Sequence, residues 1–274
     1  MTSAKDAAYA LGDGEPERRR LMLQARFIAE LTREVFARAG LAPGMRVLDV
    51  GCGVGDVSLL AREFVGAGGS VLGVDRSAHS LTLARTRAHE AGCANLQFVE
   101  AGLDSLPECG PFDALVGRLI LLYLPDPAQS LRRVLERVRP GGLVVFHEMD
   151  MTAARSVPAC PLYTRVGEWL TSTFARAGVD VLMGSHLYAT FRAAGLAPQL
   201  WASHCVAGGD DNGIYEWLAA TLGSLMPIAE QLGVTARDEV QLETLASRLR
   251  AEVAAGGGVI HSPVYVGAWA RKPE

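Results

Sequence analysis

The 274-residue sequence predicts an α/β fold in which a mostly parallel sheet of seven strands carries flanking helices and a helical cap. Two observations lead to this prediction. Short apolar runs typical of buried parallel strands alternate along residues 46–150 with segments whose apolar residues recur at helical spacing. The first run, Arg46–Val50, leads directly into the glycine-rich turn Gly51–Gly55 and a helix from Asp56. A strand, a glycine-rich turn and a helix form the first unit of a doubly wound, Rossmann-like fold.

The first half of the chain supplies most of the sheet. A helix over residues 15–39 stops at Gly40 and Pro43, and residues 1–14 before it are expected to form a mobile arm. The helices after it begin near residues 56, 78 and 127. The first five strands are expected at residues 46–50, 71–75, 96–100, 112–116 and 142–150. Because strand and helix alternate, the sheet should be parallel with right-handed crossovers.

The second half is less regular. It is expected to form helices at 163–177 and 185–194 and the last two strands at 198–208 and 259–272. Thr235, followed three residues later by Asp238, has the spacing of a capping box. This box is expected to open a helix that turns Leu242, Leu245 and Leu249 inward.

The segment 210–255 between the last two strands has a helical pattern and is longer than a simple crossover needs. We therefore expect it to form a lid. The predicted organisation is an N-terminal arm and cap helix over residues 1–40, followed by one domain over residues 41–274 that contains this insertion.

Composition excludes several classes of protein. The net charge is −4 and the longest basic block is Arg18–Arg20, which argues against nucleic-acid binding. The five cysteines are dispersed without a C-x-x-C pair, so reduced thiols are expected and a disulfide framework or zinc site is not. The N-terminus lacks the apolar core of a signal peptide, and the longest apolar run, Leu119–Leu124, is too short to span a membrane. A cytoplasmic protein without a membrane partner is therefore expected.

The glycine-rich turn favours one kind of ligand. Its spacing is G-x-G-x-G, whereas the dinucleotide fingerprint is G-x-G-x-x-G. Two acids, Asp49 and Asp56, flank the turn, and they would repel a pyrophosphate but suit a ligand that carries an ammonium and a sulfonium. The second strand ends in Asp75, at a position suited to binding two ribose hydroxyls.

These motifs resemble those of the class I S-adenosylmethionine-dependent methyltransferases, in particular bacterial small-molecule enzymes of the ubiquinone-biosynthesis type. The resemblance covers residues 40–150 well and the C-terminal half in outline. It implies S-adenosylmethionine as the cofactor. It also implies that a set of residues around the turn and the next strand ends binds this cofactor: Asp49, Gly51, Cys52, Gly53, Gly55, Asp75, Arg76, Gly102, Leu103, Asp104, Gly117 and Arg118.

Within that set the resemblance implies separate roles. The turn holds the methionine part, Asp75 the ribose and Arg76 a place beside the adenine. Many relatives place an acid directly after a glycine to bind the adenine amino group, but this chain has Gly102 there and its acid at Asp104, so backbone groups of Leu103 and Asp104 are the expected contacts.

After the fourth strand, Gly117 and Arg118 occupy the place where a backbone carbonyl meets the methionine ammonium. For the Arg118 side chain, a surface or carboxylate-pairing role is an equal alternative. The resemblance also suggests that the N-terminal helix, with Tyr9 and Gln24, closes over the cofactor, although simple packing on the sheet explains its pattern as well.

Methyl transfer needs alignment of the reacting atoms more than it needs catalytic groups. A general base is required only when the acceptor carries a proton at the working pH. His147 and Glu148 are the leading candidates, because they follow the fifth strand at the edge where such sheets bind ligands. Asp150 is a further candidate, and His186, His204, Tyr123 and Tyr188 are weaker ones. Each lone histidine has a structural role as its alternative.

Relatives that methylate catechols bind magnesium with an acid after the fourth strand. This chain has Arg118 there, so no metal is expected. The predicted activity is methyl transfer to a small organic acceptor by a monomer or homodimer, with O-methylation of a secondary metabolite as the first expectation. N- or C-methylation, an NAD(P)-dependent reductase and a cofactor-binding protein without catalysis are the alternatives.

Overall fold

The computed structural model describes residues 15–106, 108–208 and 213–274, and the expected N-terminal arm lies outside these ranges. The described chain divides into two compact units. The sheet unit contains residues 28–148, 183–202 and 265–274. The helical unit contains residues 15–27, 149–182 and 203–264, apart from the stretch 209–212.

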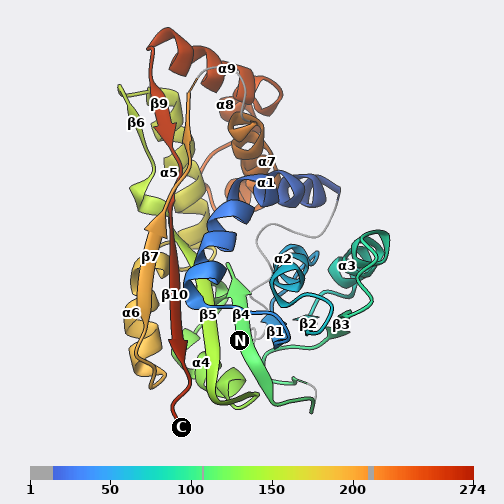
Figure 1. Cartoon of the computed structure of the whole chain (residues 1–274). Helices are drawn as coiled ribbons and strands as arrows, with labels where there is room; N and C mark the ends of the chain where they lie inside the picture. Colours follow the sequence, from blue (N-terminus) through green and yellow to red (C-terminus); the bar gives the residue numbers. More distant parts are fainter. Residues whose placement is uncertain (1–14, 107, 209–212) are drawn as a thin grey trace, which may run out of the picture. The chain divides into compact units, whose positions relative to one another are not determined.

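The sheet unit contains the predicted seven-stranded sheet, in the order β3-β2-β1-β4-β5-β10-β7 (Figure 1). Its strands are β1 (Arg46–Val50), β2 (Ser70–Asp75), β3 (Leu96–Glu100), β4 (Phe112–Arg118), β5 (Val138–Asp150), β7 (Gln199–Ser203) and β10 (Val264–Arg271). Strands β1 to β5 pair in parallel, as predicted from their alternation with helices. Strand β10 is antiparallel to β5. The hydrogen bonds show this direction, since Lys272, just after the end of β10, bonds to Gly141 and Gly142 near the start of β5.

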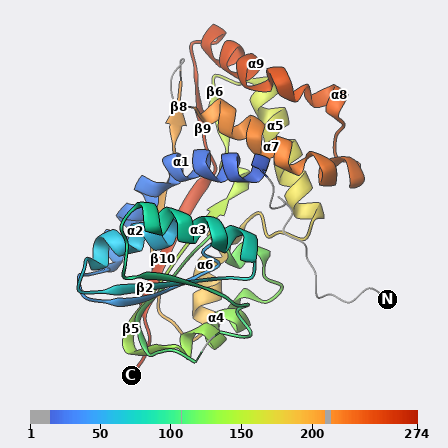
Figure 2. The same cartoon turned by 90° about the vertical axis from the view of Figure 1, so that its right-hand side faces the viewer.

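Helices cover both faces of this sheet. Figure 2 shows α2 (Asp56–Val65) and α3 (Ala78–Glu90) on one face, and α4 (Pro127–Leu135) and α6 (Met183–Ala193) on the other. The short 3-10 helix η1 (Leu121–Tyr123) follows β4. A long helix, α1 (Glu15–Ala39), has the predicted bounds, and its second half belongs to the sheet unit. Apolar side chains from α1, α2 and the central strands, Val35, Phe36 and Val47 among them, form one buried cluster that fixes the carboxyl end of β1.

The helical unit has its own core. Its elements are η2 (Met151–Ala153), β6 (Arg155–Val157), α5 (Pro161–Arg176), β8 (Val206–Ala207), α7 (Ile214–Gln231), α8 (Arg237–Val240), α9 (Leu242–Ala255) and β9 (Val259–His261). The three short strands form a separate antiparallel sheet in the order β6-β9-β8. Helices α5, α7 and α9 pack together around buried Tyr215, Leu222 and Leu249. This unit is larger than the predicted insertion 210–255, because it also includes α5 and the small sheet.

Two predicted strands are wrong in their extent. The stretch 198–208 divides into β7 in the large sheet and β8 in the small one, and the stretch 259–272 divides into β9 and β10 in the same way. The break before β10 lies at Ser262 and Pro263, and a proline offers no N–H group to a strand ladder. The Ser262 N–H instead donates to the Cys205 carbonyl at 2.9 Å, so the two breaks are joined to each other.

The predicted capping box is also wrong. The Thr235 hydroxyl bonds to the Glu239 carboxylate at 3.0 Å and does not cap a long helix. Helix α8 is only four residues long, and Gln241, with φ of 51°, separates it from α9. Leu245 and Leu249 are buried as predicted, and Leu242 is partly buried beside them. The turn chemistry at Gln241 therefore decides where this helix begins.

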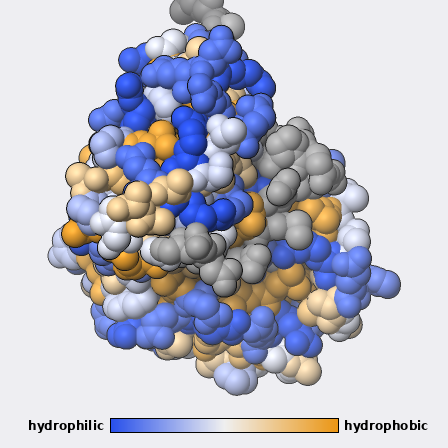
Figure 3. Space-filling view, turned by 90° about the horizontal axis from the view of Figure 1, so that it is seen from above, coloured by the Kyte–Doolittle hydropathy of each residue, from blue (hydrophilic) through white to orange (hydrophobic). Residues whose placement is uncertain are grey.

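Among the described residues, no helix is both long and apolar enough to cross a membrane. The face drawn in Figure 3 carries hydrophobic residues in separate patches among hydrophilic ones.

Candidate functional site

The glycine-rich turn after β1 is shaped by two glycines with different surroundings. Gly51 has a φ of 67°, and a Cβ atom there would lie only 2.6 Å from the Ile120 side chain. Gly53 has a φ of 52°, and a Cβ atom there would meet nothing within 4 Å. Gly51 is therefore required by packing, whereas Gly53 keeps its backbone open on the side where a ligand could lie.

Asp75, at the end of β2, is tied to this turn. Its Oδ2 accepts a hydrogen bond from the Gly53 N–H at 2.8 Å, and its Oδ1 accepts one from the Ser77 N–H at 2.8 Å. The carboxylate is half-buried and each oxygen has a second lone pair, so it can still accept bonds from ribose hydroxyls. Arg76, which follows it, is exposed. These positions fit the predicted ribose site.

Asp49 is the buried acid of the site. It is 1% exposed, and its Oδ2 accepts a hydrogen bond from the Ser58 hydroxyl at 2.5 Å. Its other oxygen, Oδ1, has no hydrogen-bond partner among the described residues. Burial raises the pKa of Asp49 to about 7, against the opposing effects of Ser58 and the Arg118 charge. A buried carboxylate oxygen without a partner fits a cationic ligand such as the ammonium group of S-adenosylmethionine.

Arg118 and Asp56 face each other at the same edge of the sheet. The Arg118 side chain is 6% exposed, and its Nη2 lies 3.9 Å from Asp56 Oδ2. The other Asp56 oxygen pairs with Arg87 at 2.6 Å, and Arg87 also donates to the Val54 carbonyl in the glycine-rich turn. Burial lowers the pKa of Arg118, while the charges of Asp56 and Asp49 act in the opposite direction. The burial and this ion pair fit the carboxylate-pairing alternative, and the place of Arg118 at the cofactor stays a prediction.

Three further predicted cofactor residues mainly pack the turn. Cys52 is buried in the apolar cluster, and burial raises the pKa of its thiol, so a nucleophilic role is disfavoured. Gly55 forms the N-cap of α2, where a Cβ atom would press on Phe98. Gly117 lies in β4 opposite Val50 and Phe146, and a Cβ atom there would clash with the Phe146 ring.

The predicted adenine loop is built from local bonds. The Gly102 N–H donates to the Ser105 hydroxyl at 3.1 Å, and the Ala101 N–H donates to the Asp75 carbonyl at 2.9 Å. Leu103 is half-buried, and the exposed Asp104 carboxylate forms an ion pair with Arg133. The loop therefore lies next to Asp75, and its contact with a cofactor stays a prediction.

Both predicted catalytic side chains are fully buried in the sheet unit. The Glu148 Oε1 accepts hydrogen bonds from the backbone N–H groups of Ile120 and Leu121, at 3.0 and 2.9 Å. It thereby holds the loop that presses Ile120 against Gly51. His147 Nδ1 lies 3.0 Å from the Thr32 hydroxyl, and its ring packs near Tyr265. Burial, and then the Arg118 charge, lower the pKa of His147 to about 3.

The weaker catalytic candidates are divided between the two units. Asp150 accepts bonds from Thr152 and caps η2 in the helical unit. In the same unit His204 pairs with His261, with 2.9 Å between their ring nitrogens. His186 and Tyr188 are exposed on α6, and half-buried Tyr123 ends η1.

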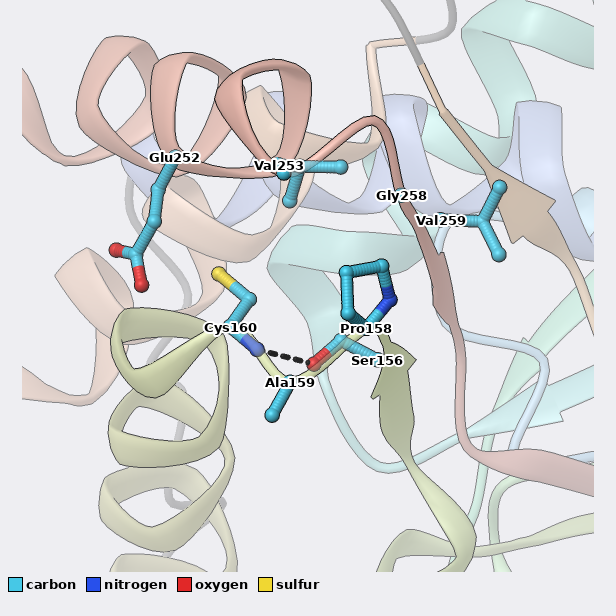
Figure 4. Close-up of a pocket in the computed structure, with 9 residues that line it drawn as sticks. Ser156, Pro158, Ala159, Cys160, Glu252, Val253, Gly258 and Val259 are labelled. Atoms are coloured by element: carbon cyan, nitrogen blue, oxygen red, sulfur yellow. Dashed lines mark hydrogen bonds between the residues drawn. The ribbon is translucent and has the colours of Figure 1, made fainter.

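The helical unit has a pocket of its own, lined by residues of β6, α9 and β9. In Figure 4 the Cys160 backbone N–H donates to the Ser156 hydroxyl, at 2.8 Å. Burial, with the Glu252 charge beside it, raises the pKa of the Cys160 thiol, so this cysteine is not an activated nucleophile. In the described parts of the chain no three His, Cys, Asp or Glu side chains are grouped as metal ligands.

Two residues of the site were missed at the sequence level. Ser58, in the first turns of α2, bonds to Asp49, and Thr32 on α1 bonds to His147. Thr32 stands four residues after Ile28 and three before Val35, so a polar residue interrupts the buried face of an amphipathic helix. That interruption is the signal that could have revealed it.

Comparison with known proteins finds one family. The sequence model described as "Methyltransferase domain" matches residues 41–195, more than half of the chain. A ubiquinone biosynthesis O-methyltransferase from Paracidovorax citrulli is 39% identical over 118 residues, which make up 42% of this chain and 48% of that protein. The chain spans about half the length of the curated relatives it matches.

Solved structures share the fold at low sequence identity. The YcgJ protein from Bacillus subtilis has a TM-score of 0.57 and 19% identity, covering 94% of this chain and 99% of its own. The [4+2]-cyclase SpnF has a TM-score of 0.52 and 22% identity, covering 89% of this chain and 80% of its own. The predicted class I methyltransferase fold is confirmed, and one of these neighbours is named for another reaction.

Proposed function

This chain belongs to the methyltransferase domain family, and we propose that it transfers a methyl group from S-adenosylmethionine to a small organic acceptor. One observation carries the proposal. The open backbone at Gly53 is bordered by Asp75, which can accept ribose hydroxyls, and by the buried Asp49, whose Oδ1 has no partner among the described residues. Asp75 can accept hydrogen bonds from a ribose, and the buried Asp49 carboxylate can pair with a cationic amino group. A ligand that carries both groups therefore suits this turn.

The same observation disfavours an NAD(P)-dependent reductase. A pyrophosphate needs free N–H groups at a helix N-terminus. Here Asp56 opens α2 and Asp75 already accepts the Gly53 N–H, so two carboxylates stand where phosphate oxygens would lie. Because the Gly53 N–H is already bonded to Asp75, it is not available to a phosphate oxygen, which supports the methyl-donor assignment.

In this proposal the cofactor, when bound, supplies an activated methyl group on a sulfonium, which is a good leaving group. The protein binds the cofactor and the acceptor and orients them. Asp49 would hold the ammonium end, Asp75 the ribose, and the loop from Gly102 to Asp104 would border the adenine. Glu148 keeps the loop after β4 in place, so that Ile120 supports the turn from behind. Holding the reacting atoms in line supplies much of the rate.

We propose O-methylation as the reaction type, because the similar curated proteins include O-methyltransferases of ubiquinone biosynthesis. A demethylmenaquinone methyltransferase is also similar, at 33% identity over 132 residues, and N- or C-methylation is the alternative. We further propose a bacterial, cytoplasmic enzyme of secondary metabolism that acts as a monomer or homodimer without nucleic acid. These finer assignments rest on the relatives and on the low net charge of −4.

The second candidate is a cofactor-binding protein that does not transfer the methyl group. The similarity of the fold to SpnF, which is named a [4+2]-cyclase, supports it as an alternative.

The test combines binding and turnover. Calorimetry should show that the chain binds S-adenosylmethionine, and Asp75→Ala should weaken binding about tenfold or more, since hydrogen bonds to a charged group contribute about 1.5–3 kcal/mol. Glu90→Ala, at the exposed end of α3, is the control and should bind as the wild type does. A labelled methyl group should then appear in one of a panel of phenols, amines and carbon acids. Binding without transfer to any of them would favour the second candidate, and oxidation of NADPH would favour the reductase.

A further inference from the structure

The side chains of Arg118 and His147 lie side by side on the large sheet. The two residues are register partners on the parallel strands β4 and β5, so they point to the same face. Thr32 of α1 covers them there, with its hydroxyl 3.2 Å from Arg118 Nη1 and 3.0 Å from His147 Nδ1. All three residues belong to the sheet unit.

The hydrogen bonds of Thr32 determine where the proton of His147 lies. A hydroxyl has one proton and two lone pairs, and an arginine can only donate. The Thr32 oxygen also lies 2.9 Å from the Ile28 carbonyl, which can only accept. If Thr32 donates to Ile28, every contact is a hydrogen bond, and His147 donates from Nδ1–H. If Thr32 donates to His147 instead, both the Ile28 contact and a buried Nε2–H are left unsatisfied.

We therefore assign the Nδ1–H tautomer to His147. In this state the buried Nε2 is a bare lone pair, in keeping with its having no hydrogen-bond partner among the described residues. Burial and the neighbouring Arg118 lower the pKa of the ring to about 3, so the ring is uncharged at neutral pH and its hydrogen bonds decide the tautomer. A ring with such a pKa is a weak base, which argues against the catalytic role expected for it.

The guanidinium that Thr32 holds faces one acid of the turn and acts on the charge of another. Arg118 Nη2 lies 3.9 Å from Asp56, and its charge also acts on Asp49. Both acids border the turn that meets the amino-acid end of the cofactor in the function proposed above. The direction of the Arg118 side chain therefore sets the charge balance at that end.

We propose that His147 is a positioning residue: its Nδ1–H group holds the Thr32 hydroxyl, which orients Arg118 beside Asp49 and Asp56 and so sets the affinity for the cofactor. The affinity part of this inference rests on the proposed function, and the hydrogen-bond assignment does not.

Three substitutions of His147 separate positioning from base catalysis. Asparagine places an amide N–H group near the position of Nδ1, glutamine places one near Nε2, and leucine places none. His147→Leu should weaken S-adenosylmethionine binding about tenfold, the usual range for residues coupled in one network. His147→Asn should restore most of the affinity and His147→Gln should not. Thr32→Val should match His147→Leu, and the double variant should be no worse than either single one.

Base catalysis predicts a different pattern. All three variants of His147 would then lose about a hundredfold or more in kcat with unchanged cofactor affinity. That outcome, or equal loss of affinity in His147→Asn and His147→Leu when both melt at the same temperature, would overturn the proposal. His79→Leu, on the exposed surface of α3, is the matched control for loss of a histidine.

A second measurement needs no cofactor. Long-range proton–nitrogen correlation spectra of the free protein should show a protonated Nδ1 and a bare Nε2 for His147, unchanged from neutral pH down to about pH 5. A protonated Nε2, or a ring that titrates near pH 6, would refute the assignment even if the wild type binds S-adenosylmethionine. If the wild type does not bind it, the proposed function fails, and the spectra still decide the hydrogen-bond network.

Discussion

Replacing Asp49 by asparagine should make the protein more stable at pH 8 and a weaker binder of the cofactor. Burial raises the pKa of Asp49 from 3.8 to about 7. The folded protein therefore binds this proton more tightly than the unfolded chain does. The stability that the protonated carboxyl contributes is fully present below about pH 4 and is lost as pH rises to about 7.

The size of this change in stability follows from the shift in the pKa of Asp49. A difference of about three pKa units corresponds to about 4 kcal/mol of unfolding free energy, which the ionised carboxylate forfeits above pH 7. Asparagine avoids this loss, but it places an N–H₂ group where Oδ1 has no partner among the described residues, at a cost of about 1–3 kcal/mol. Asp49→Asn should therefore gain roughly 1–3 kcal/mol at pH 8 and lose roughly 1–3 kcal/mol at about pH 4, where the wild-type carboxyl is protonated and only the cost of the N–H₂ group remains.

Urea unfolding of both proteins across this pH range, with circular dichroism and fluorescence compared, measures the difference. Asp113→Asn is the control, because the Arg46 N–H and Arg139 lower the pKa of Asp113, so its loss should destabilise the protein at pH 8. Ser58→Ala removes a bond that favours the ionised Asp49 and should steepen the fall in stability with pH. A pH-independent difference between wild type and Asp49→Asn would refute the buried, raised pKa. Unchanged S-adenosylmethionine affinity in Asp49→Asn would refute its role as the ammonium partner.

Three further outcomes are expected. Turnover should survive EDTA, since Arg118 stands where a metal-binding acid would be needed, and a loss restored by magnesium would contradict this. Glu148→Ala should lower the free energy of unfolding by about 2–4 kcal/mol, because two backbone N–H groups lose a charged acceptor, whereas Glu148→Gln should retain most of the stability. An equal loss of stability in both variants would contradict this role for Glu148. If the segment 210–255 forms the expected lid, Trp217→Phe, which removes a buried N–H without a described partner but keeps the ring beside Phe27, should raise the acceptor KM and leave cofactor affinity within about twofold. Trp169→Phe is the control, and an unchanged KM would remove Trp217 from that lid.

The parts of the fold that the sequence predicted are those set by local pattern. Arg46–Val50, Ser70–Asp75 and Leu96–Glu100 are apolar runs ended by glycine or acid, and each is a strand of the sheet. The strand from residue 259 failed because a regular alternation continues through Ser262 and Pro263, while tertiary pairing with Cys205 ends it. Which of two sheets a strand joins depends on partners far along the chain, and no local signal carries that information.

For the candidate site, the sequence predicted which residues lie at the strand ends but not what surrounds their side chains. Asp49, Gly53 and Asp75 were expected at the site from strand ends and turn geometry, and the Gly53 N–H bonds to Asp75. His147 and Glu148 share the same kind of position, yet both are buried, one against Thr32 and one against the loop at Ile120. Position at a strand end thus brings a side chain to the right edge of the sheet, but the next layer of packing decides whether it meets a ligand or supports a residue that does.

That second layer explains why the site can hold so many charges. Asp49, Asp56 and Arg118 are all largely buried, and isolated charges there would be unfavourable. Arg87 forms an ion pair with one oxygen of Asp56. The Thr32 hydroxyl accepts a hydrogen bond from Arg118, and the neutral His147 contacts the same hydroxyl without adding a charge. Of the two acids, Asp49 is the one with a buried oxygen that has no hydrogen-bond partner among the described residues, and burial raises its pKa to about 7. A cation bound at this oxygen would lower that pKa, so cofactor binding should release a proton near pH 7, which calorimetry in buffers of different ionisation enthalpy can measure.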